Sequence, residues 1–290
     1  MKQNQDDFKI QLHAHPYFDK YSLNDVINVT KKKKIDILAL ERLNKEIFPD
    51  LIRRSKKLPS HYKTDNDNTL IQILDKEDGR KIYLPKAIEL EAKEDFHLII
   101  IGDSQIKPHS YIEEVIENAL KKDSLVIFDH PFVDNKYVAK DITREKEAEV
   151  EKICKKYSNN ICLEWNAYCI PWVRELIGGS DVNKKVERLS ASLVKQGYNI
   201  PIVTDSDIHA RYKWSLNEID KAQIKTKKVN VNSGKTITGK TMISDLKESI
   251  DSGNYKINTE YVSFTHLMFN FCLPLGINKI CKKLYKEPRA

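Results

Sequence analysis

The feature that most constrains the fold is a regular alternation of short apolar runs with longer amphipathic runs. The apolar runs have the length and composition of strands and cover residues 8–15, 35–40, 69–92, 96–102, 124–131, 160–167 and 200–207. The intervening runs have helical character over residues 23–34, 49–58, 110–123, 143–157 and 182–198. Strands that alternate with helices predict a parallel sheet in an α/β protein, and the number of repeats suits a barrel.

Local signals support several of these element boundaries. Asp78-Gly79 predicts a turn inside the run 69–92, which therefore contains more than one strand. Thr143 is the expected N-cap of one helix, and Gly197 is the expected end of another. Residues 225–241 are polar and predict a loop. We expect a barrel domain over residues 1–225 and a helical C-terminal extension over residues 226–290 that packs on it.

Composition narrows the class of protein without naming a substrate. The 290 residues carry a formal net charge of +7, much of it in lysine runs such as 31–34. A basic excess suits phosphate-bearing substrates and nucleic acid equally, so it does not distinguish between them. The five cysteines include no C-x-x-C pair, which argues against a disulfide framework and against a zinc ribbon. The oligomeric state is not readable from the sequence.

The two ends of the chain favour a cytoplasmic protein without a transmembrane segment. The first residues, MKQNQDDF, are polar and acidic, unlike a signal peptide. The apolar stretch 261–277 is interrupted by Thr265, His266, Asn270 and Pro274, so it makes a poor membrane span. Residues 261–286 join this stretch to a basic one. We expect them to pack as helix on the barrel, with a membrane-surface or partner helix as the alternative.

Histidines and carboxylates gather where the predicted strands end. His13 and His15 lie two residues apart in QLHAH, so in a strand both imidazoles face the same side and form a natural metal clamp. The alternative is a pair of incidental histidines. Further candidates at or near strand ends are Glu89, Glu91, Asp129, His130, Glu164, Asp205, Asp207 and His209.

Two less specific interpretations remain for these groups. Asp205 and its neighbours also suit an ordinary turn, and Glu89 with Glu91 also suits an exposed edge strand. In a parallel barrel, however, all strand exits open on one face, where active sites lie. More than four converging ligands exceed the need of a structural zinc site and predict a multinuclear catalytic centre.

The motifs LHAH, FDHP and SDIH, in that order, resemble those of the PHP (polymerase and histidinol phosphatase) superfamily over about residues 8–209. The resemblance implies a distorted (β/α)7 barrel and hydrolysis of phosphoesters with two or three divalent ions. It also implies that Glu89 bridges two ions. The implied metal ligands are His13, His15, Glu89, His130, Asp207 and His209.

One motif departs from the family pattern. Where the family has T-D-H-N, this chain has Glu41, Arg42, Leu43 and Asn44, and leucine cannot bind a metal. We therefore expect at most two ions, of zinc, manganese or iron. His209, without its usual partner at position 43, becomes a candidate general acid or phosphate contact. Arg42 and Arg211 are candidate phosphate-binding residues, with a surface position as the alternative for each.

These expectations define a function with two alternatives. The principal hypothesis is a metal-dependent phosphoesterase that acts on a small phosphorylated metabolite or nucleotide through a metal-activated hydroxide. Its catalytic residues are Glu89, Asp207 and His209, with Asp207 also able to accept the proton of the attacking water. The alternatives are a pseudoenzyme that binds a phosphorylated ligand or partner, which the altered second motif favours, and a nuclease-like protein, which the basic charge permits.

Overall fold

The computed structural model describes residues 7–103, 107–134, 141–176, 178–227 and 237–272. Its strands are β1 (Phe8–Gln11), β2 (Ala14–Pro16), β3 (Ile37–Leu38), β4 (Tyr62–Asn66), β5 (Leu70–Asp75), β6 (Lys81–Pro85), β7 (Ala87–Glu91), β8 (His97–Ile101), β9 (Leu125–Asp129), β10 (Ile161–Asn166), β11 (Ile202–Asp205), β12 (Ile208–Ala210), β13 (Ala222–Thr226) and β14 (Tyr255–Thr259). Its helices are α1 (Leu23–Lys32), α2 (Phe48–Ser55), α3 (Ile112–Leu120), α4 (Arg144–Lys156), α5 (Pro171–Leu176), α6 (Val182–Lys195), α7 (Gly239–Asp251) and α8 (Phe264–Leu267), with a 3-10 helix η2 (Lys213–Glu218) and a π-helix η3 (Met268–Cys272).

The described strands form three sheets rather than one closed ladder. A seven-stranded sheet has the order β14-β13-β1-β3-β6-β5-β4, a five-stranded sheet has the order β11-β10-β9-β8-β7, and β12 pairs with β2. Two seams join the larger sheets. At one, Leu43 forms an isolated parallel bridge with Glu89 of β7. At the other, the Thr204 hydroxyl of β11 donates to the carbonyl of Asn258 in β14 at 3.1 Å.

The prediction of an α/β fold is confirmed, but the prediction of a parallel, closed barrel is not. Parallel pairs occur between β1 and β3, β3 and β6, β9 and β10, β10 and β11, and β2 and β12. In contrast, β7, β8 and β9 pair antiparallel, as do β4, β5 and β6. The cause is visible in the chain, because only residues 92–96 separate β7 from β8, too few for the crossover that parallel neighbours need.

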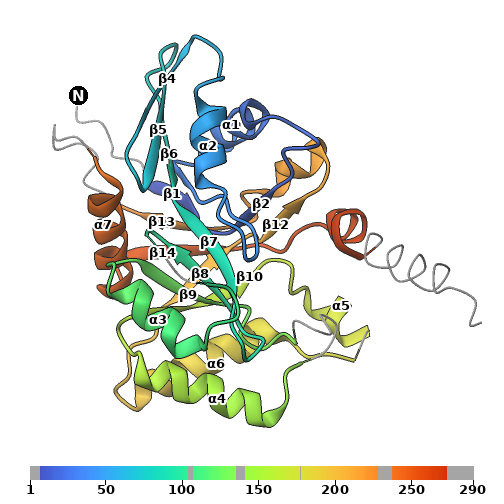
Figure 1. Ribbon diagram of the computed structural model, residues 1–290. Helices are drawn as coiled ribbons and strands as arrows, with labels where there is room; N and C mark the ends of the chain where they lie inside the picture. The colour runs from blue at the N-terminus through green and yellow to red at the C-terminus, as the bar shows by residue number, and fades with distance from the viewer. Residues whose placement is uncertain (1–6, 104–106, 135–140, 177, 228–236, 273–290) are drawn as a thin grey trace, which may run out of the picture.

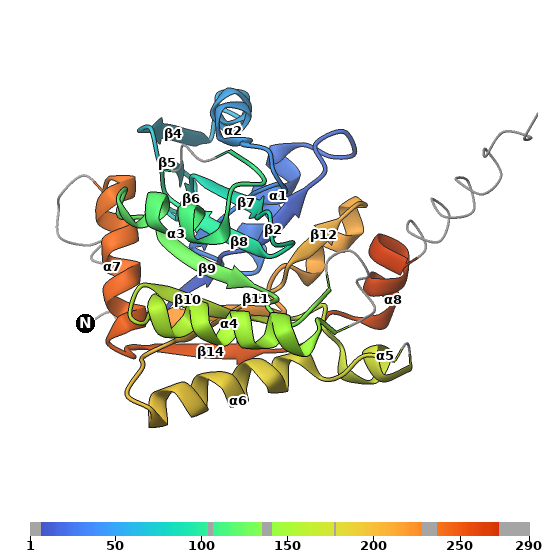
Figure 2. The same ribbon diagram turned by 60° about the horizontal axis from the view of Figure 1, so that its bottom comes forward.

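Helices cover the sheets on opposite sides of the molecule. Helices α3, α4 and α6 pack on the five-stranded sheet, and α1 and α2 lie at the far end beside β4–β6 (Figures 1 and 2). Between the two large sheets lies a third apolar cluster, which includes Ile10, Ile99, Ile127 and Val203 and is closed at one end by α7. This inner core holds the strands in place around the polar groups at its opposite end.

The local signals for helix and turn boundaries are confirmed. The Thr143 side chain accepts a hydrogen bond from the backbone of Lys146 and caps α4. Gly197 follows α6 with φ of +89°, and Gly79 forms the turn between β5 and β6 with φ of +73°. Both angles lie in the left-handed region that glycine adopts without a steric penalty. These boundaries were readable from sequence because each depends only on neighbouring residues.

The C-terminal part of the described chain is built into the fold. The expectation that the extension over residues 226–290 is helical is wrong in part, because β14 follows α7 and pairs with β13 along its full length. Val262 and Leu267 then pack against Trp165 and Ala167. Residues 273–290, the larger part of the predicted C-terminal helix, lie outside the described residues, and the domain boundary at 225/226 stays a prediction. No helix in the described ranges combines the length and apolarity needed to cross a bilayer.

Candidate metal centre

The histidines and carboxylates picked out in the sequence converge at one end of the sheets. His13 lies between β1 and β2, and the pairing of β2 with β12 sets His15 directly beside His209. The rings of His15 and His209 stack with centroids 4.3 Å apart. Glu89 comes from β7, His130 follows β9, and the remaining acids come from the ends of β9, β10 and β11. All six predicted metal ligands therefore lie within one cluster.

The first half of the cluster surrounds Asp207. The Nε2 atoms of His13 and His15 lie only 2.9 Å apart, so both point into the same space. Oδ1 of Asp207 lies 3.3 Å from Nε2 of His13 and 3.4 Å from Nε2 of His15. Nε2 of His209 lies 3.2 Å from the same oxygen. Two imidazoles and a carboxylate at these spacings form a suitable donor set for a divalent transition metal.

The second half of the cluster is centred on Glu89, His97 and His130. Oε1 of Glu89 lies 2.6 Å from Nδ1 of His97, whereas its other oxygen lies 3.4 Å from Nε2 of His15. Nε2 of His130 lies 3.0 Å from Oδ2 of Asp129. The ligand atoms of Glu89, His97, Asp129 and His130 all lie within 4.8 Å of one another. The two oxygens of Glu89 thus face two different groups of histidines.

Glu164 is a positioning residue rather than a free ligand. Its Oε1 accepts a hydrogen bond from Nδ1 of His13 at 2.7 Å. Its Oε2 accepts two more, from the backbone of His130 at 2.8 Å and from the side chain of Asn166 at 2.9 Å. Because a carboxylate only accepts, Nδ1 of His13 carries a hydrogen, so when the imidazole is neutral its lone pair is on Nε2, which faces Asp207.

Crowding of buried acids perturbs their protonation. Burial, reinforced by the neighbouring Glu164, raises the pKa of Asp129 and of Asp205 well above the usual range. Burial also raises the pKa of Glu89, but the hydrogen bond from His97 and the charges of His15 and His13 outweigh burial and leave that pKa low. The cluster therefore contains more carboxyl groups than its histidines balance, and burial favours protons on Asp129 and Asp205.

Burial and the charge of His97 lower the pKa of His130 to about 4, so its imidazole is neutral at pH 7. A neutral imidazole is the form that binds a metal. His13 behaves differently. Burial lowers its pKa, but the carboxylates of Asp207 and Glu164 outweigh burial and raise it well above the usual value. Without a metal, a proton on His13 therefore supplies positive charge that balances these acids, as a bound cation would.

Glu41 tests whether cations fit this cluster. Its side chain is fully buried, and neither carboxylate oxygen has a hydrogen-bond partner among the described residues. Its Oε1 lies 3.9 Å from Nε2 of His13, and burial, with further acids nearby, raises its pKa. A buried carboxylate without donors is strongly destabilising unless a cation balances it. The donor set and this carboxylate fit divalent ions.

The backbone around the cluster is strained at two candidate ligands. His130 has φ of +24° and Asp207 has φ of +43°, in or near a region that residues with a side chain rarely adopt. Such conformations cost about 1–3 kcal/mol each and persist where the surrounding structure imposes them. Strain at two residues of the same cluster is typical of a functional site.

Leu43 and Asn44, in the segment of residues 41–44 that departs from the family pattern, have a structural role. Leu43 is 41% exposed, and its side chain has no atom that could bind a metal. The backbone of Asn44 donates to the carbonyl of Glu89 at 2.8 Å, and its side chain donates to Glu91 at 3.2 Å. The segment joins the two large sheets and supports β7. Glu91 is engaged by Asn44, so of the two glutamates in β7 it is Glu89 that enters the cluster.

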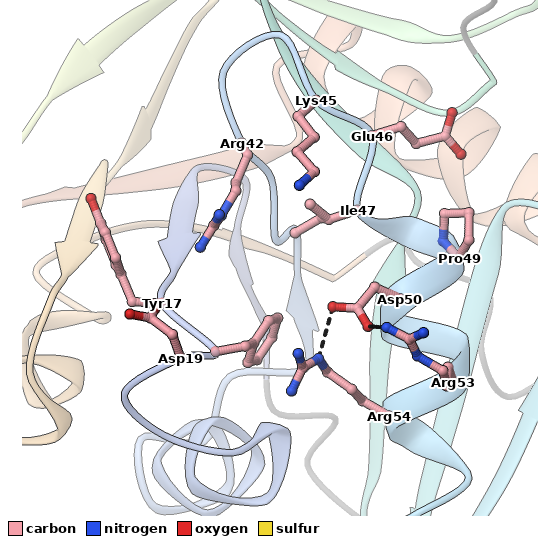
Figure 3. Close-up of a pocket in the computed structure, with 11 residues that line it drawn as sticks. Tyr17, Asp19, Arg42, Lys45, Glu46, Ile47, Pro49, Asp50, Arg53 and Arg54 are labelled. Carbon is pink, nitrogen blue, oxygen red and sulfur yellow. Dashed lines mark hydrogen bonds and ion pairs between the residues drawn. The ribbon is translucent and has the colours of Figure 1, made fainter.

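Arg42 and Arg211 both lie against the ring of Tyr17, near the cluster. Their guanidinium carbons lie 5.7 Å and 5.3 Å from the centroid of the Tyr17 ring. Arg42 donates to the carbonyl of Pro16, and Arg211 donates through Nε to the carbonyl of Asn270 at 2.8 Å. Arg42 also lines a pocket of about 890 Å³ between Tyr17 and α2 (Figure 3). Both arginines remain candidate substrate contacts.

Sequence reasoning missed two members of the cluster. His97 begins β8, whereas the sequence pattern predicts ligands where parallel strands end. Since β8 runs antiparallel, His97 pairs with Asp129 at the end of β9. Glu41, which the sequence showed only as part of the altered second motif, is buried against His13. The signal for His97 is its place after the apolar-acidic run of β7.

The chain was compared with known proteins. A scan against protein-family models and a search of the curated proteins find no match. Among solved structures, PsfC from Pseudomonas syringae matches with a TM-score of 0.54 at 14% identity, over 96% of this chain and 99% of PsfC. The lesion-specific endonuclease PfuEndoQ from Pyrococcus furiosus matches with a TM-score of 0.51 at 16% identity, over 87% of this chain.

A third solved structure shares the fold. A two-domain protein from Bacteroides vulgatus, described as containing a predicted PHP-like metal-dependent phosphoesterase, matches with a TM-score of 0.51 at 13% identity, over 89% of this chain. This chain spans 57% of the endonuclease and 66% of the two-domain protein. These matches show that the chain shares its fold with these solved structures, one of which is described as PHP-like.

Proposed function

We propose that this protein is a metal-dependent phosphoester hydrolase. One observation carries the proposal. The two oxygens of Glu89 face separate histidine groups, with His97 at 2.6 Å on one side and His15 at 3.4 Å on the other. A carboxylate in this position suits a bridge between two divalent ions, which is the arrangement of two-metal phosphoesterases. The likeness to a PHP-like phosphoesterase supports the same reaction class.

The residues divide into two ligand sets that share Glu89. His13, His15 and Asp207 would hold one ion, and His97, His130 and Asp129 would hold the other. Divalent ions held there would lower the pKa of a water to near neutrality and balance the charge of phosphate oxygens. We keep the count at two, because the group around His209 shares its other members, His15 and Asp207, with the first set.

The protein's own side chains provide the remaining functions. Asp207 faces the ligand space and can accept the proton of the attacking water. His209 is about a quarter exposed and stacks on His15, a position that suits protonation of the leaving oxygen or contact with phosphate. Glu164 holds His13 in the tautomer that leaves Nε2 free. We propose a small phosphorylated metabolite or nucleotide as substrate, with Zn, Mn or Fe as the metal.

Substitution of Glu89 tests the proposal. The measurements are metal content by elemental analysis and turnover of p-nitrophenyl phosphate and bis(p-nitrophenyl) phosphate. We expect two ions per chain in the unaltered protein. Glu89→Gln should lower kcat/KM by about 1,000-fold, which corresponds to about 4 kcal/mol of lost transition-state stabilisation. Glu91→Gln, two residues away on the same strand and bonded to Asn44, is the matched control and should retain activity.

Other outcomes point to other functions. Three ions per chain would refute the proposed count. Two ions without turnover of either ester would favour a pseudoenzyme that binds a phosphorylated ligand. A nuclease-like function is the second candidate, favoured by the likeness to endonuclease Q, a structure of which contains a 27-mer duplex with an abasic lesion at its active site. Oligonucleotide binding that weakens steeply with salt would support it.

A further inference from the structure

The pocket beside the metal centre has two cations, Arg42 and Lys45, that form no ion pair with its acids among the described residues. It is lined by Tyr17, Phe18, Asp19, Arg42, Lys45, Glu46, Ile47, Pro49, Asp50, Arg53 and Arg54 and has a volume of about 890 Å³. This volume suits a small organic molecule. Arg42 and Lys45 both point into the space between Tyr17 and α2 (Figure 3).

The acids of the pocket are engaged elsewhere. Asp50 forms ion pairs with Arg53 at 2.5 Å and with Arg54 at 2.8 Å, so its negative charge is already shared between two arginines. Glu46 pairs with Lys86 at 3.3 Å. Asp19 pairs with its neighbour Lys20 at 3.3 Å and also interacts electrostatically with Arg42, although the two form no ion pair. Among the described residues, neither Arg42 nor Lys45 forms an ion pair, within 4.0 Å, with a carboxylate of this pocket. The pocket therefore presents positive charge to a ligand.

Arg42 is held ready for an anion. Its Nη2 and Nε donate to the carbonyl of Pro16 at 3.1 Å and 3.4 Å, which fixes the plane of the guanidinium and leaves Nη1 for a ligand. A guanidinium fixed in this way loses little entropy on binding a phosphate or carboxylate. Lys45, which is exposed, adds a second donor from the same loop.

Two residues of the pocket are close neighbours in sequence of residues in the metal centre. Arg42 directly follows Glu41, whose carboxylate lies 3.9 Å from His13, and Tyr17 follows His15 by two residues. A substrate with its scissile phosphate at the metal centre can therefore extend past Tyr17 toward Arg42 and Lys45. We infer that this pocket binds a second anionic group of the substrate, so that the preferred substrates carry a phosphate or carboxylate besides the scissile phosphate.

This inference rests on the proposed function only for the place of the scissile phosphate, so binding tests it separately from turnover. The probes are alkyl monophosphates and the matching α,ω-alkanediol bisphosphates with two to six carbons, titrated calorimetrically into metal-loaded protein. We expect the best bisphosphate to bind about tenfold tighter than its monophosphate, because the second group gains charge-assisted hydrogen bonds. Phosphate release from the same compounds gives kcat/KM in parallel.

Two variants locate the preference. Lys45→Met should remove most of the preference for the bisphosphate and leave monophosphate binding unchanged. Arg53→Met is the matched control, since Arg53 lines the same pocket but forms an ion pair with Asp50. Equal affinity for both compounds in the unaltered protein, or equal effects of the two variants, would overturn the inference. Bisphosphate preference without any phosphate release would retain the inference and reject the proposed hydrolase.

Discussion

Glu164 accepts a hydrogen bond from Nδ1 of His13 at 2.7 Å, and this contact decides which nitrogen of His13 is available to a metal. With Nδ1 protonated, the Nε2 lone pair faces His15 and Asp207. Such carboxylate–histidine contacts orient the ring and increase its basicity as a ligand. Glu164, which the sequence indicates only as one of several candidates, would therefore act on the metal through His13.

We predict that Glu164→Gln weakens metal binding by about 10- to 100-fold. The amide keeps the size of the side chain but is a weaker acceptor for His13. Calorimetric titration of the metal-free protein with Zn²⁺ or Mn²⁺ measures the change. Glu151→Gln, at a surface ion pair with Lys155, is the control and should leave affinity unchanged. An unchanged affinity in Glu164→Gln would contradict the positioning role.

Removal of metal should destabilise the fold. Bound ions offset the repulsion among the buried carboxylates of Glu41, Asp129 and Asp205, and a ligand that binds only the folded state stabilises it by mass action. Dialysis against a chelator should lower Tm by on the order of 5 °C or more, and returned Zn²⁺ or Mn²⁺ should restore it. Differential scanning calorimetry provides the measurement, and identical melting curves in the two states would argue against resident ions.

The effect of Glu41→Gln on stability should change sign when metal is bound. In chelated protein its buried carboxylate has no hydrogen-bond donor among the described residues, so Glu41→Gln should raise the free energy of unfolding by about 1 kcal/mol or more. In metal-loaded protein the same substitution removes a charge that balances the ions and should lower stability. Urea unfolding in both states tests this reversal. Stabilisation of the same size in both states would show that Glu41 does not interact with the ions.

Asp141 stabilises the fold in a pH-dependent way. It accepts hydrogen bonds from Arg174 at 2.7 Å, Lys185 at 3.0 Å and the backbone of Ser180 at 3.0 Å. Burial alone would raise its pKa, but these donors outweigh burial and lower the pKa well below the usual range. Because the folded pKa is depressed, this stability is fully present above the unfolded value of about 3.9 and is lost as pH falls below it.

Asp141→Asn should therefore lower the free energy of unfolding by about 1–3 kcal/mol at pH 7. The deficit relative to unaltered protein should stay constant down to about pH 5 and shrink below about pH 4. Urea unfolding across this range, with Glu151→Gln as the exposed control, measures the profile. A deficit of the same size at pH 3 and pH 7 would assign the effect to packing instead of charge.

Local sequence determined the features that depend on neighbouring residues. The spacing of His13 and His15 places both on one side because side chains alternate along an extended chain. Thr143 and Gly197 mark helix boundaries through capping and a left-handed backbone, which need no distant partner. Glu89, His130, Asp207 and His209 were found because each lies in or directly after an apolar run.

Only the tertiary structure decided which strand ends meet. Strand direction and register depend on partners far along the chain, and hydrophobic pattern does not encode them. The antiparallel direction of β8 brings His97, at a strand start, to the ends of its neighbours. The same non-local packing buries Glu41 beside His13, turns Glu164 into the acceptor that orients His13, and places Arg42 at a pocket whose acids are neutralised by other cations.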